Sequence, residues 1–251
     1  MFDLIVVVKN GEHCISETLR SISSQTDSLC DIYFVDGGSL DKTVKFAKEF
    51  YLKFLLEESD SGIYDAMNKG INAIPNSKKR YTLFLNCGDF LIDSSIMKYL
   101  EIQILKNDFP DIVYSDIVTI SKNLEKKNRL KNHDLLAKGM SLCHQSVLIR
   151  NDVLKKKRFD ISYKYASDYD MILGLYLDKM KFFKSKKPMA LYSDGGVSSS
   201  HPVEVYIEMF KIAVDKLSFL DLILYSPYHL RNILIGFYSL IKIHLKKNST
   251  L

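Results

Sequence analysis

The chain has 251 residues, of which 47% are hydrophobic and 26% are charged. This length and hydrophobic content suffice to bury the core of one large domain, and the charged fraction is ordinary for a globular protein. The formal net charge is +5, a modest excess without a recognised nucleic-acid module, so we expect no nucleic-acid partner. The basic clusters at 155–158, 184–187 and 246–247 are either solvated surface or a means of attracting anionic lipid or a pyrophosphate-bearing substrate.

We recognise no signal peptide, membrane-spanning segment or paired-cysteine motif in the sequence. Residues 1–3 carry no basic residue, and the apolar run 4–8 is too short for a signal peptide. No uninterrupted apolar stretch of about 18 residues occurs, so we predict no membrane-spanning helix. The four cysteines form no C-x-x-C pair and no zinc spacing with histidine, which favours reduced thiols in a cytoplasmic protein.

Short apolar runs alternate with helical patterns over the first 90 residues. Residues 4–8 form a continuous, mostly β-branched run, which is typical of a strand buried on both faces. Ser39 can cap the helix after the second run, with Asp41 in its first turn. The predicted strands are 4–8, 32–35, 54–56 and 81–85, and the helices between them begin near residues 15, 39 and 62. This alternation predicts an α/β fold with a mostly parallel sheet and right-handed crossovers.

The pattern is looser from residue 91 onward. Residue spacing predicts helices at 96–105 and 168–177, an alternating, antiparallel type of strand at 111–120, and a further strand at 144–149. The polar and basic segment 123–132 is expected to be an exposed turn. Residues 193–201 are rich in glycine and serine, which predicts a mobile loop that closes over the site through Gly195 and Gly196.

The segment from residue 203 onward is mainly helical by pattern, and Pro227 is expected to break the helix before it. Its last part is amphipathic. Small or polar residues fall on one face and apolar residues on the other: Asn232, Gly236, Ser239, Lys242 and Lys246 against Ile233, Leu234, Phe237, Leu240, Ile241 and Leu245. Two interpretations stay open. The helix packs on its own domain or on a partner subunit, or it lies at a membrane surface, which the nearby Arg231 and Lys247 favour.

Three short acidic motifs are predicted at the ends of these elements. Asp36-Gly37-Gly38-Ser39-Leu40-Asp41 and Asn86-Cys87-Gly88-Asp89 each follow a strand, and Ser167-Asp168-Tyr169-Asp170 opens a helix. In open α/β sheets, ligands bind just outside the carboxyl ends of the strands. Carboxylates delivered there, one set near a nucleotide and one near a metal, suit a nucleotide-diphosphate substrate.

The first motif can contact a nucleotide. The carboxylate of Asp36 can accept hydrogen bonds from a base or a ribose, and the glycines after it let the backbone approach a ligand closely. Further along, Asp60, Asp65 and Asn68 lie near a predicted helix N-terminus, which itself favours phosphate. The alternative for both segments is structural, namely a turn and helix caps.

The second and third motifs can supply a metal ligand and a base. Mg²⁺ takes one or two carboxylates together with substrate phosphates, so Asp89 can bind it with support from the amide of Asn86. A carboxylate at Asp168 can take the proton from an attacking hydroxyl. The alternatives are an aspartate cap for Asp89 and helix-dipole complementarity for Asp168 and Asp170.

Several segments, in order, resemble the family-2 glycosyltransferases of the GT-A fold. They are Val6-Val7-Val8-Lys9-Asn10, Thr18-Leu19-Arg20-Ser21-Ile22-Ser23-Ser24-Gln25, Val35-Asp36-Gly37-Gly38-Ser39-Leu40-Asp41-Lys42-Thr43, the block 60–70, and Phe84-Leu85-Asn86-Cys87-Gly88-Asp89. The resemblance covers about residues 3–90 and then thins to His144-Gln145 and the 167–170 motif. Within the family, the chain looks closest to bacterial enzymes of colanic-acid, capsule and O-antigen assembly.

The resemblance implies an inverting, metal-dependent transfer of one sugar from a nucleotide-diphosphate sugar, with UDP favoured by family habit. The implied acceptor is a glycan or a polyprenyl-pyrophosphate-linked oligosaccharide. The implied catalytic domain spans 1–202, with a nucleotide-sugar half over about 1–90 and an acceptor half over about 91–202, and a helical extension follows over 203–251. We expect a cytoplasmic protein that sits at the inner face of the cell membrane if the extension binds lipid. Homo-oligomerisation stays open.

The resemblance also implies roles for single residues. Asp168 would be the catalytic base, and Asp89 would bind Mg²⁺ or Mn²⁺. The residues implied to bind the donor are Asn10, Asp36, Gly38, Ser39, Asp60, Gly62, Asn68, Asn86 and Gly88. Those implied to contact the acceptor or a phosphate are His144, Gln145 and Asp170, although a purely structural role for His144 stays open.

The chain departs from the family pattern at three acidic positions. Asn86 replaces the first acid of the D-x-D-like motif, Gly37 the second acid after strand 32–35, and Ser167 the glutamate before the base. The chain has no tryptophan, so it lacks the Gln-x-x-Arg-Trp motif, which argues against a processive synthase. It also lacks the glycine motifs of dinucleotide-binding and P-loop enzymes. The alternative to an enzyme is a non-catalytic module that binds sugar nucleotides or tethers a membrane complex.

Overall fold

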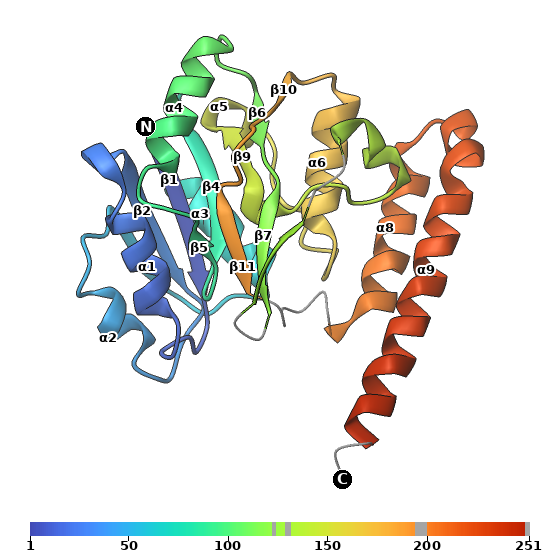
Figure 1. Ribbon diagram of the computed structural model, residues 1–251, viewed down its shortest axis with the longest axis horizontal. Helices are drawn as coiled ribbons and strands as arrows, with labels where there is room; N and C mark the ends of the chain where they lie inside the picture. Colours follow the sequence, from blue (N-terminus) through green and yellow to red (C-terminus); the bar gives the residue numbers. More distant parts are fainter. Residues whose placement is uncertain (122–123, 129–131, 194–199, 249–251) are drawn as a thin grey trace.

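The computed structural model describes residues 1–121, 124–128, 132–193 and 200–248 (Figure 1). Its centre is a sheet of seven strands. In spatial order these are β10 (Phe182–Lys184), β6 (Ile112–Tyr114), β9 (Val147–Arg150), β4 (Tyr81–Asn86), β1 (Phe2–Val8), β2 (Cys30–Asp36) and β3 (Phe54–Glu57). Strands β4, β1, β2 and β3 are mutually parallel, while β9 runs antiparallel to β4 and β6. The α/β fold with a mostly parallel sheet is confirmed.

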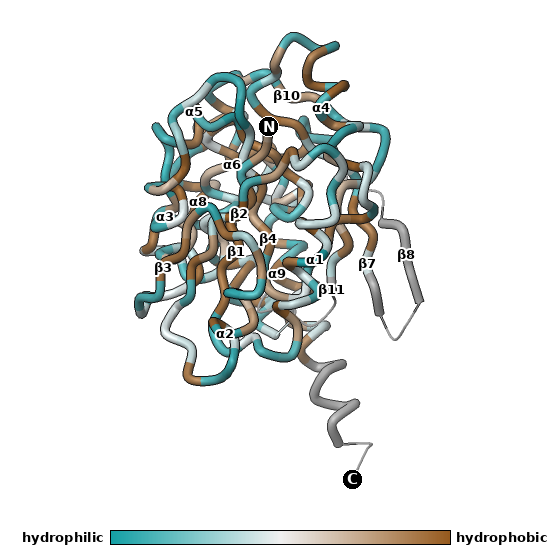
Figure 2. The backbone as a smooth tube through the Cα atoms, turned by 90° about the vertical axis from the view of Figure 1, so that its left-hand side faces the viewer, coloured by the Kyte–Doolittle hydropathy of each residue, from teal (hydrophilic) through white to brown (hydrophobic). Residues whose placement is uncertain are grey.

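Helices cover both faces of this sheet because β1, β2 and β4 send successive side chains to opposite sides. Leu4 and Val6 join a core cluster with α1 (Ile15–Ser23), α2 (Thr43–Ala47) and α4 (Ile96–Lys106). On the other side, Ile5 and Val7 join a cluster with α3 (Ile63–Ala73), α5 (Asn151–Leu154), α6 (Ser167–Leu177) and α8 (Pro202–Lys216). Figure 2 shows the hydrophobic positions gathered along β1, β2 and β4.

A second, smaller sheet lies beside the first. Its order is β5 (Phe90–Leu91), β11 (Ala190–Ser193), β7 (Ile117–Ser121) and β8 (Leu124–Asn128). The single strand that we expected at 111–120 is therefore wrong, because the chain leaves the large sheet after Tyr114 and enters the small one at Ile117. Part of the segment expected as an exposed turn forms β8, since an edge strand accepts polar residues.

Two other local expectations are corrected. Helix α2 begins at Thr43 without a side-chain cap, because Ser39 bonds Asp36 and the backbone of Asn10 instead. Residues His144–Ser146 form a short 3-10 helix, η3, ahead of β9. The expected loop closure through Gly195 and Gly196 lies outside the described residues.

The amino ends of the strands are tied by a buried polar network. Asp3 is fully buried on β1, and its carboxylate accepts hydrogen bonds from Arg80 and, at 2.7 Å, from Asn151. Arg80 also pairs with Asp31 on β2 at 2.6 Å. The hydrogen bonds and negative charges of Asp3 and Asp31 raise the pKa of Arg80, and they outweigh its burial, which alone would lower that pKa. The network fastens β1, β2, β4 and α5 together at this end.

The C-terminal helix α9 (Phe219–Asn248) packs against α8, and Pro227 lies inside it rather than ending the helix before it. Its small and polar face turns inward: Gly236 lies against Pro202, and His229 is buried with its imidazole 3.0 Å from the carbonyl oxygen of Ala137. The apolar face points outward. It exposes Phe219, Leu220, Ile223, Leu224, Leu230, Leu234, Phe237 and Tyr238.

No helix in the described part of the chain combines the length and apolar character needed to cross a membrane.

Candidate functional site

A cavity of about 910 Å³ opens beside the carboxyl ends of β1 and β4. Helices α3, α6 and α8 and the segment before β9 form its walls. The polar and charged lining residues are Lys9, Asp60, Asn86, His144, Gln145, Lys164 and Asp168. The apolar and aromatic lining includes Ile63, Tyr64, Met140, Leu142, Tyr165, Tyr192, Val205, Tyr206 and Met209.

Asp168 lies in the first turn of α6, and its carboxylate is held on both oxygens. The backbone N–H of Tyr169 donates to Oδ1 at 2.8 Å, and the Tyr64 hydroxyl lies 3.2 Å from the same oxygen. The Nδ1 atom of His144 lies 3.0 Å from Oδ2. Burial, followed by the charge of Asp168, raises the pKa of Tyr64, so this hydroxyl stays protonated. The Asp168 side chain is 16% exposed, so it can meet a ligand in the cavity.

His144 links Asp168 to the motif after β4. Its Nε2 atom lies 3.3 Å from the amide nitrogen of Asn86. An amide nitrogen can only donate, so with the Asn86 amide in this orientation Nε2 accepts and Nδ1 carries the proton toward Asp168. The Oδ1 atom of Asn86 is then buried without a hydrogen-bond partner among the described residues. Buried acceptors are seldom left unpaired, so this atom is suited to a ligand.

Asp89 lies in the turn after β4 and is 4% exposed. Its Oδ2 atom accepts hydrogen bonds from Gln145 and from the backbone of Asn86, each at 3.2 Å. Within the described residues no group of three or more His, Cys, Asp or Glu side chains is arranged to hold a metal. The side-chain oxygens of Asp89 and Asn86 are of the type that Mg²⁺ or Mn²⁺ takes together with substrate phosphates and water.

The polar groups of the turn after β2 form hydrogen bonds with one another. Asp36 is 2% exposed, and its carboxylate accepts hydrogen bonds from the backbone N–H groups of Gly38 and Ser39 at 3.0 and 2.8 Å. The Ser39 hydroxyl accepts from the Asn10 N–H at 2.8 Å. None of these four residues is part of the lining of the described cavity.

Asp60 occupies the space that a side chain at position 37 would need. A Cβ atom on Gly37 would lie 2.0 Å from Asp60 Oδ2. The same carboxylate accepts the Gly62 N–H at 3.0 Å, where Gly62 has φ 140°. The missing acid at position 37 therefore makes room for Asp60, a relation between two distant positions that the sequence pattern did not reveal.

Three other predicted residues are committed to structural contacts. The Asn68 side chain bonds the backbone of Phe159 through both amide atoms, at 2.9 and 3.0 Å. Asp170 points away from the cavity toward Lys216 at 3.1 Å, and burial raises the pKa of its carboxyl. The backbone N–H of Gly88 donates to Thr18 on α1 at 2.9 Å.

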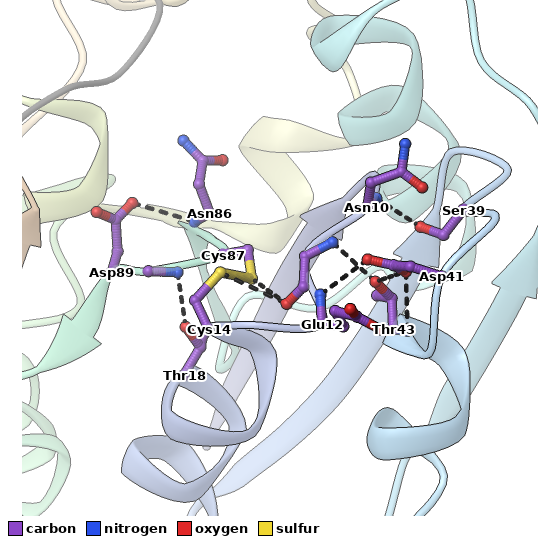
Figure 3. The surroundings of a disulfide bond; sticks show 12 residues. Asn10, Glu12, Cys14, Thr18, Ser39, Asp41, Thr43, Asn86, Cys87 and Asp89 are labelled. Carbon is purple, nitrogen blue, oxygen red and sulfur yellow. Dashed lines mark hydrogen bonds between the residues drawn. A yellow bond between two sulfur atoms is a disulfide. The ribbon is translucent and has the colours of Figure 1, made fainter.

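A disulfide joins Cys14 to Cys87 in the middle of the second motif (Figure 3). The expectation that all four cysteines are reduced is therefore wrong. The two cysteines are 73 residues apart, and only the parallel pairing of β1 and β4 brings their loops together. Cys87 also packs against Gly11, where a Cβ atom would lie 2.6 Å from its sulfur. The bond fastens the turn that carries Asn86 and Asp89 to the start of α1.

The apolar wall of the cavity was missed by sequence reasoning. Val205, Tyr206 and Met209 come from α8, a segment that we had assigned to an extension beyond the catalytic domain. Their i, i+1 and i+4 spacing predicts one face of a helix, but it does not reveal what that face meets.

Residues 3–168 match the family profile described as "Glycosyl transferase family 2". Among curated proteins, the "PGL/p-HBAD biosynthesis glycosyltransferase" of Mycobacterium bovis is 27% identical over 176 residues, which are 68% of this chain and 67% of the relative. The "Uncharacterized glycosyltransferase RT0329" of Rickettsia typhi is 26% identical over 205 residues, which are 74% of this chain and 64% of the relative.

Two solved structures are examples of the same fold. Staphylococcus aureus TarS 1-349 in complex with UDP-GlcNAc has a TM-score of 0.70 and 19% identity, covering 95% of this chain and 72% of TarS. The mannosyltransferase PcManGT from Pyrobaculum calidifontis, in complex with GDP-Man and Mn²⁺, has a TM-score of 0.66 and 11% identity, covering 97% of this chain and 75% of that one.

Proposed function

The chain belongs to glycosyltransferase family 2, and from this premise we propose that it transfers a single sugar from a nucleotide-diphosphate sugar to an acceptor hydroxyl, with inversion at the anomeric carbon. The acceptor is a glycan or a lipid-linked oligosaccharide of bacterial surface polysaccharide synthesis, as in colanic-acid, capsule and O-antigen assembly. A UDP-sugar is favoured, and the complex of TarS with UDP-GlcNAc supports this choice.

The observation that carries the proposal is the Asp168 carboxylate, which faces the cavity while its neighbours fix its position. Asp168 takes the proton of the acceptor hydroxyl, and the acceptor oxygen attacks the anomeric carbon from the side opposite the nucleotide. The bond between that carbon and the diphosphate oxygen breaks, so the nucleotide diphosphate leaves with the bonding electrons. His144 and Tyr64 orient the carboxylate, which keeps its lone pair directed at the hydroxyl.

The donor lies on the β1, β2 and β4 side of the cavity in this proposal. Asp60 and Gly62 contact the nucleotide, and the turn built from Asn10, Asp36, Gly38 and Ser39 shapes the edge of its pocket. Asn68 and Gly88 do not contact the donor directly in this proposal. Asn68 positions the backbone at Phe159, and Gly88 positions the turn after β4 against Thr18. His144 and Gln145 face the acceptor or a phosphate, with Gln145 also orienting Asp89, and Asp170 holds α6 against α8.

Asp89 and Asn86 hold the divalent ion in this proposal. Such an ion, when bound, neutralises charge on the diphosphate leaving group. The unpartnered Oδ1 of Asn86 and the acidic side chain of Asp89 are the groups that support it.

The proposal includes contact with the membrane surface through α9. Support comes from its outward apolar face, on which Leu220 is 77% and Leu234 is 70% exposed. Sedimentation with vesicles that contain phosphatidylglycerol tests this contact. The Leu220→Ser, Leu234→Ser variant should stay in the supernatant while the wild type sediments; equal sedimentation of both proteins would remove this part of the proposal.

The test of the central proposal is Asp168→Asn. Because a positioned general base contributes roughly 10²- to 10⁴-fold, we expect turnover of the nucleotide sugar to fall by that factor, while thermal-shift binding of UDP with Mn²⁺ stays unchanged. Asp178→Asn is the control, since Asp178 follows the end of the same helix and pairs with Lys157 on the surface. Full turnover by Asp168→Asn would contradict the proposed base. Absence of turnover in both the wild type and the variant, with UDP still bound, would favour a non-catalytic nucleotide-sugar-binding module.

A further inference from the structure

A second cavity of about 310 Å³ lies between α9 and the segment 135–141. It shares Met140 and Tyr206 with the main cavity, so the two spaces adjoin. Its polar lining consists of Lys138 from the 3-10 helix η2 (His133–Lys138), Ser141, and Tyr228, Arg231 and Asn232 from α9. No aspartate or glutamate of the described chain lines it.

Neither of the two cations of this cavity is paired with a carboxylate of the described residues. The Lys138 ammonium lies 4.8 Å from the centre of the Tyr228 ring and 5.8 Å from that of Tyr225, so aromatic faces hold it in place. Arg231 is exposed and lies one helical turn after Tyr228, on the same side of α9. In the described part of the chain, neither cation forms an ion pair. A lysine, an arginine and an amide around one cavity present the donors that phosphate oxygens accept.

We infer that Lys138, Arg231 and Asn232 form a subsite for a phosphate or diphosphate group of the acceptor. The inference rests on the proposed function and names a property of its acceptor. The donor diphosphate is not the ligand, because the donor side of the main cavity is formed by β1, α3 and the turn after β4, whereas this subsite adjoins the α8 wall. An acceptor that spans both cavities therefore carries its hydroxyl toward Asp168 and its anionic group toward α9.

The surroundings of the subsite suit a ligand that is also apolar. Met140 and Tyr206 line both cavities, and the exposed Leu224 and Leu230 of α9 are close in sequence to Tyr228 and Arg231. A phosphate group can belong either to a lipid headgroup or to a soluble anion, and the affinities of matched probes separate these two sources.

The experiment measures binding of three probes to the full chain: geranylgeranyl diphosphate, inorganic pyrophosphate and geranylgeraniol. We expect the wild type to bind geranylgeranyl diphosphate at least tenfold more tightly than the Lys138→Gln, Arg231→Gln variant does. The control is Lys53→Gln, Lys211→Gln, which removes the same charge from two exposed lysines outside the cavities. Should the double variant not fold, Arg231→Gln alone serves the same test.

Each outcome has a defined meaning. A tenfold preference for geranylgeranyl diphosphate over pyrophosphate assigns the subsite to a lipid headgroup, and equal affinity assigns it to a soluble phosphate. Equal binding of every probe by wild type and variant, or equal binding of geranylgeraniol and its diphosphate, overturns the subsite. Repeating the titration in Asp168→Asn separates the two proposals, because loss of the base should leave probe binding intact. Failure of the subsite thus leaves the proposed base untouched, and the reverse also holds.

Discussion

The two ends of the central sheet carry polar clusters of opposite kinds. At the amino end, the buried carboxylate of Asp3 is bonded by Arg80 and Asn151, and Arg80 is bonded again by Asp31. At the carboxyl end, Asn86 has a buried oxygen with no hydrogen-bond partner in the part of the chain that the structure describes, and Asp168 faces a cavity of about 910 Å³. The first cluster satisfies its own charges, while the second keeps acceptor atoms available for a ligand.

This difference follows from what each end must do. A buried charge is energetically costly unless it is paired. In a buried network that binds no ligand, each charged group should therefore have a partner within the protein. Ligands of open α/β sheets bind at the carboxyl ends, where bonding groups must be held in place yet left available. The amino end can therefore be disrupted with a loss of stability alone, whereas changes at the carboxyl end should alter binding.

Arg80→Met should produce the largest effect. It leaves the fully buried Asp3 and its neighbour Asp31 without their cation, and breaking a buried pair in this way costs about 3–5 kcal/mol. Urea unfolding measures this loss. Lys98→Met is the control, because Lys98 is 43% exposed in its pairs with Asp27 and Glu101, and it should cost about 1 kcal/mol or less. Equal losses for both variants would mean that the amino-end network adds nothing beyond a surface pair.

Reduction of the Cys14–Cys87 bond should have the next largest effect. The bond spans 73 residues, and disulfides typically stabilise by about 2–4 kcal/mol through restriction of the unfolded chain. A phosphine reductant should lower the free energy of unfolding of the wild type by that amount and leave Cys14→Ser unaffected. Cys30→Ser should respond like the wild type, because Cys30 is a free thiol. If the reductant leaves the free energy of unfolding of the wild type unchanged, the bond is not formed in solution.

Asn86→Asp should have the smallest effect and act on binding. It replaces the Asn86 amide, whose Oδ1 has no hydrogen-bond partner among the described residues, by a carboxylate three residues before Asp89. Because cation affinity rises with ligand charge, we expect the Mn²⁺ concentration needed for UDP binding to fall by roughly tenfold. Asn76→Asp, at an exposed position after α3, is the matched control. An unchanged Mn²⁺ requirement in Asn86→Asp would place the ion away from this side chain.

The parallel half of the fold could be predicted because its strands are buried on both faces. The runs 4–8, 32–35 and 81–85 lie within β1, β2 and β4, and helix α6 begins one residue before its expected start. Local pattern is sufficient there, since the alternation of apolar strands and helices has few arrangements. The 167–170 motif opens α6 as expected and Asp168 lines the cavity there, whereas Asp89, in the turn after β4, lies outside the lining of the described cavity.

Features that depend on distant pairs could not be predicted in this way. The Cys14–Cys87 bond requires the pairing of β1 with β4, and no local spacing records it. The amphipathic pattern of α9 did not reveal which face packs on the protein. The face with Gly236 packs closely against Pro202, whereas Leu234 and Phe237 are exposed to solvent. Pro227 remains within the helix at an exposed position, although proline usually ends one.

The contact between Gly37 and Asp60 has a consequence for how related sequences can vary. With the Asp60 side chain in its present position, a Cβ atom at 37 would lie 2.0 Å from Asp60 Oδ2, so one of the two side chains would have to move. An acid at position 37 therefore requires a smaller residue at position 60, or a side chain there that has rotated away. The two positions should therefore adjust to each other among relatives: where position 37 carries a side chain, an acid at position 60 should adopt another rotamer or be replaced by a smaller residue.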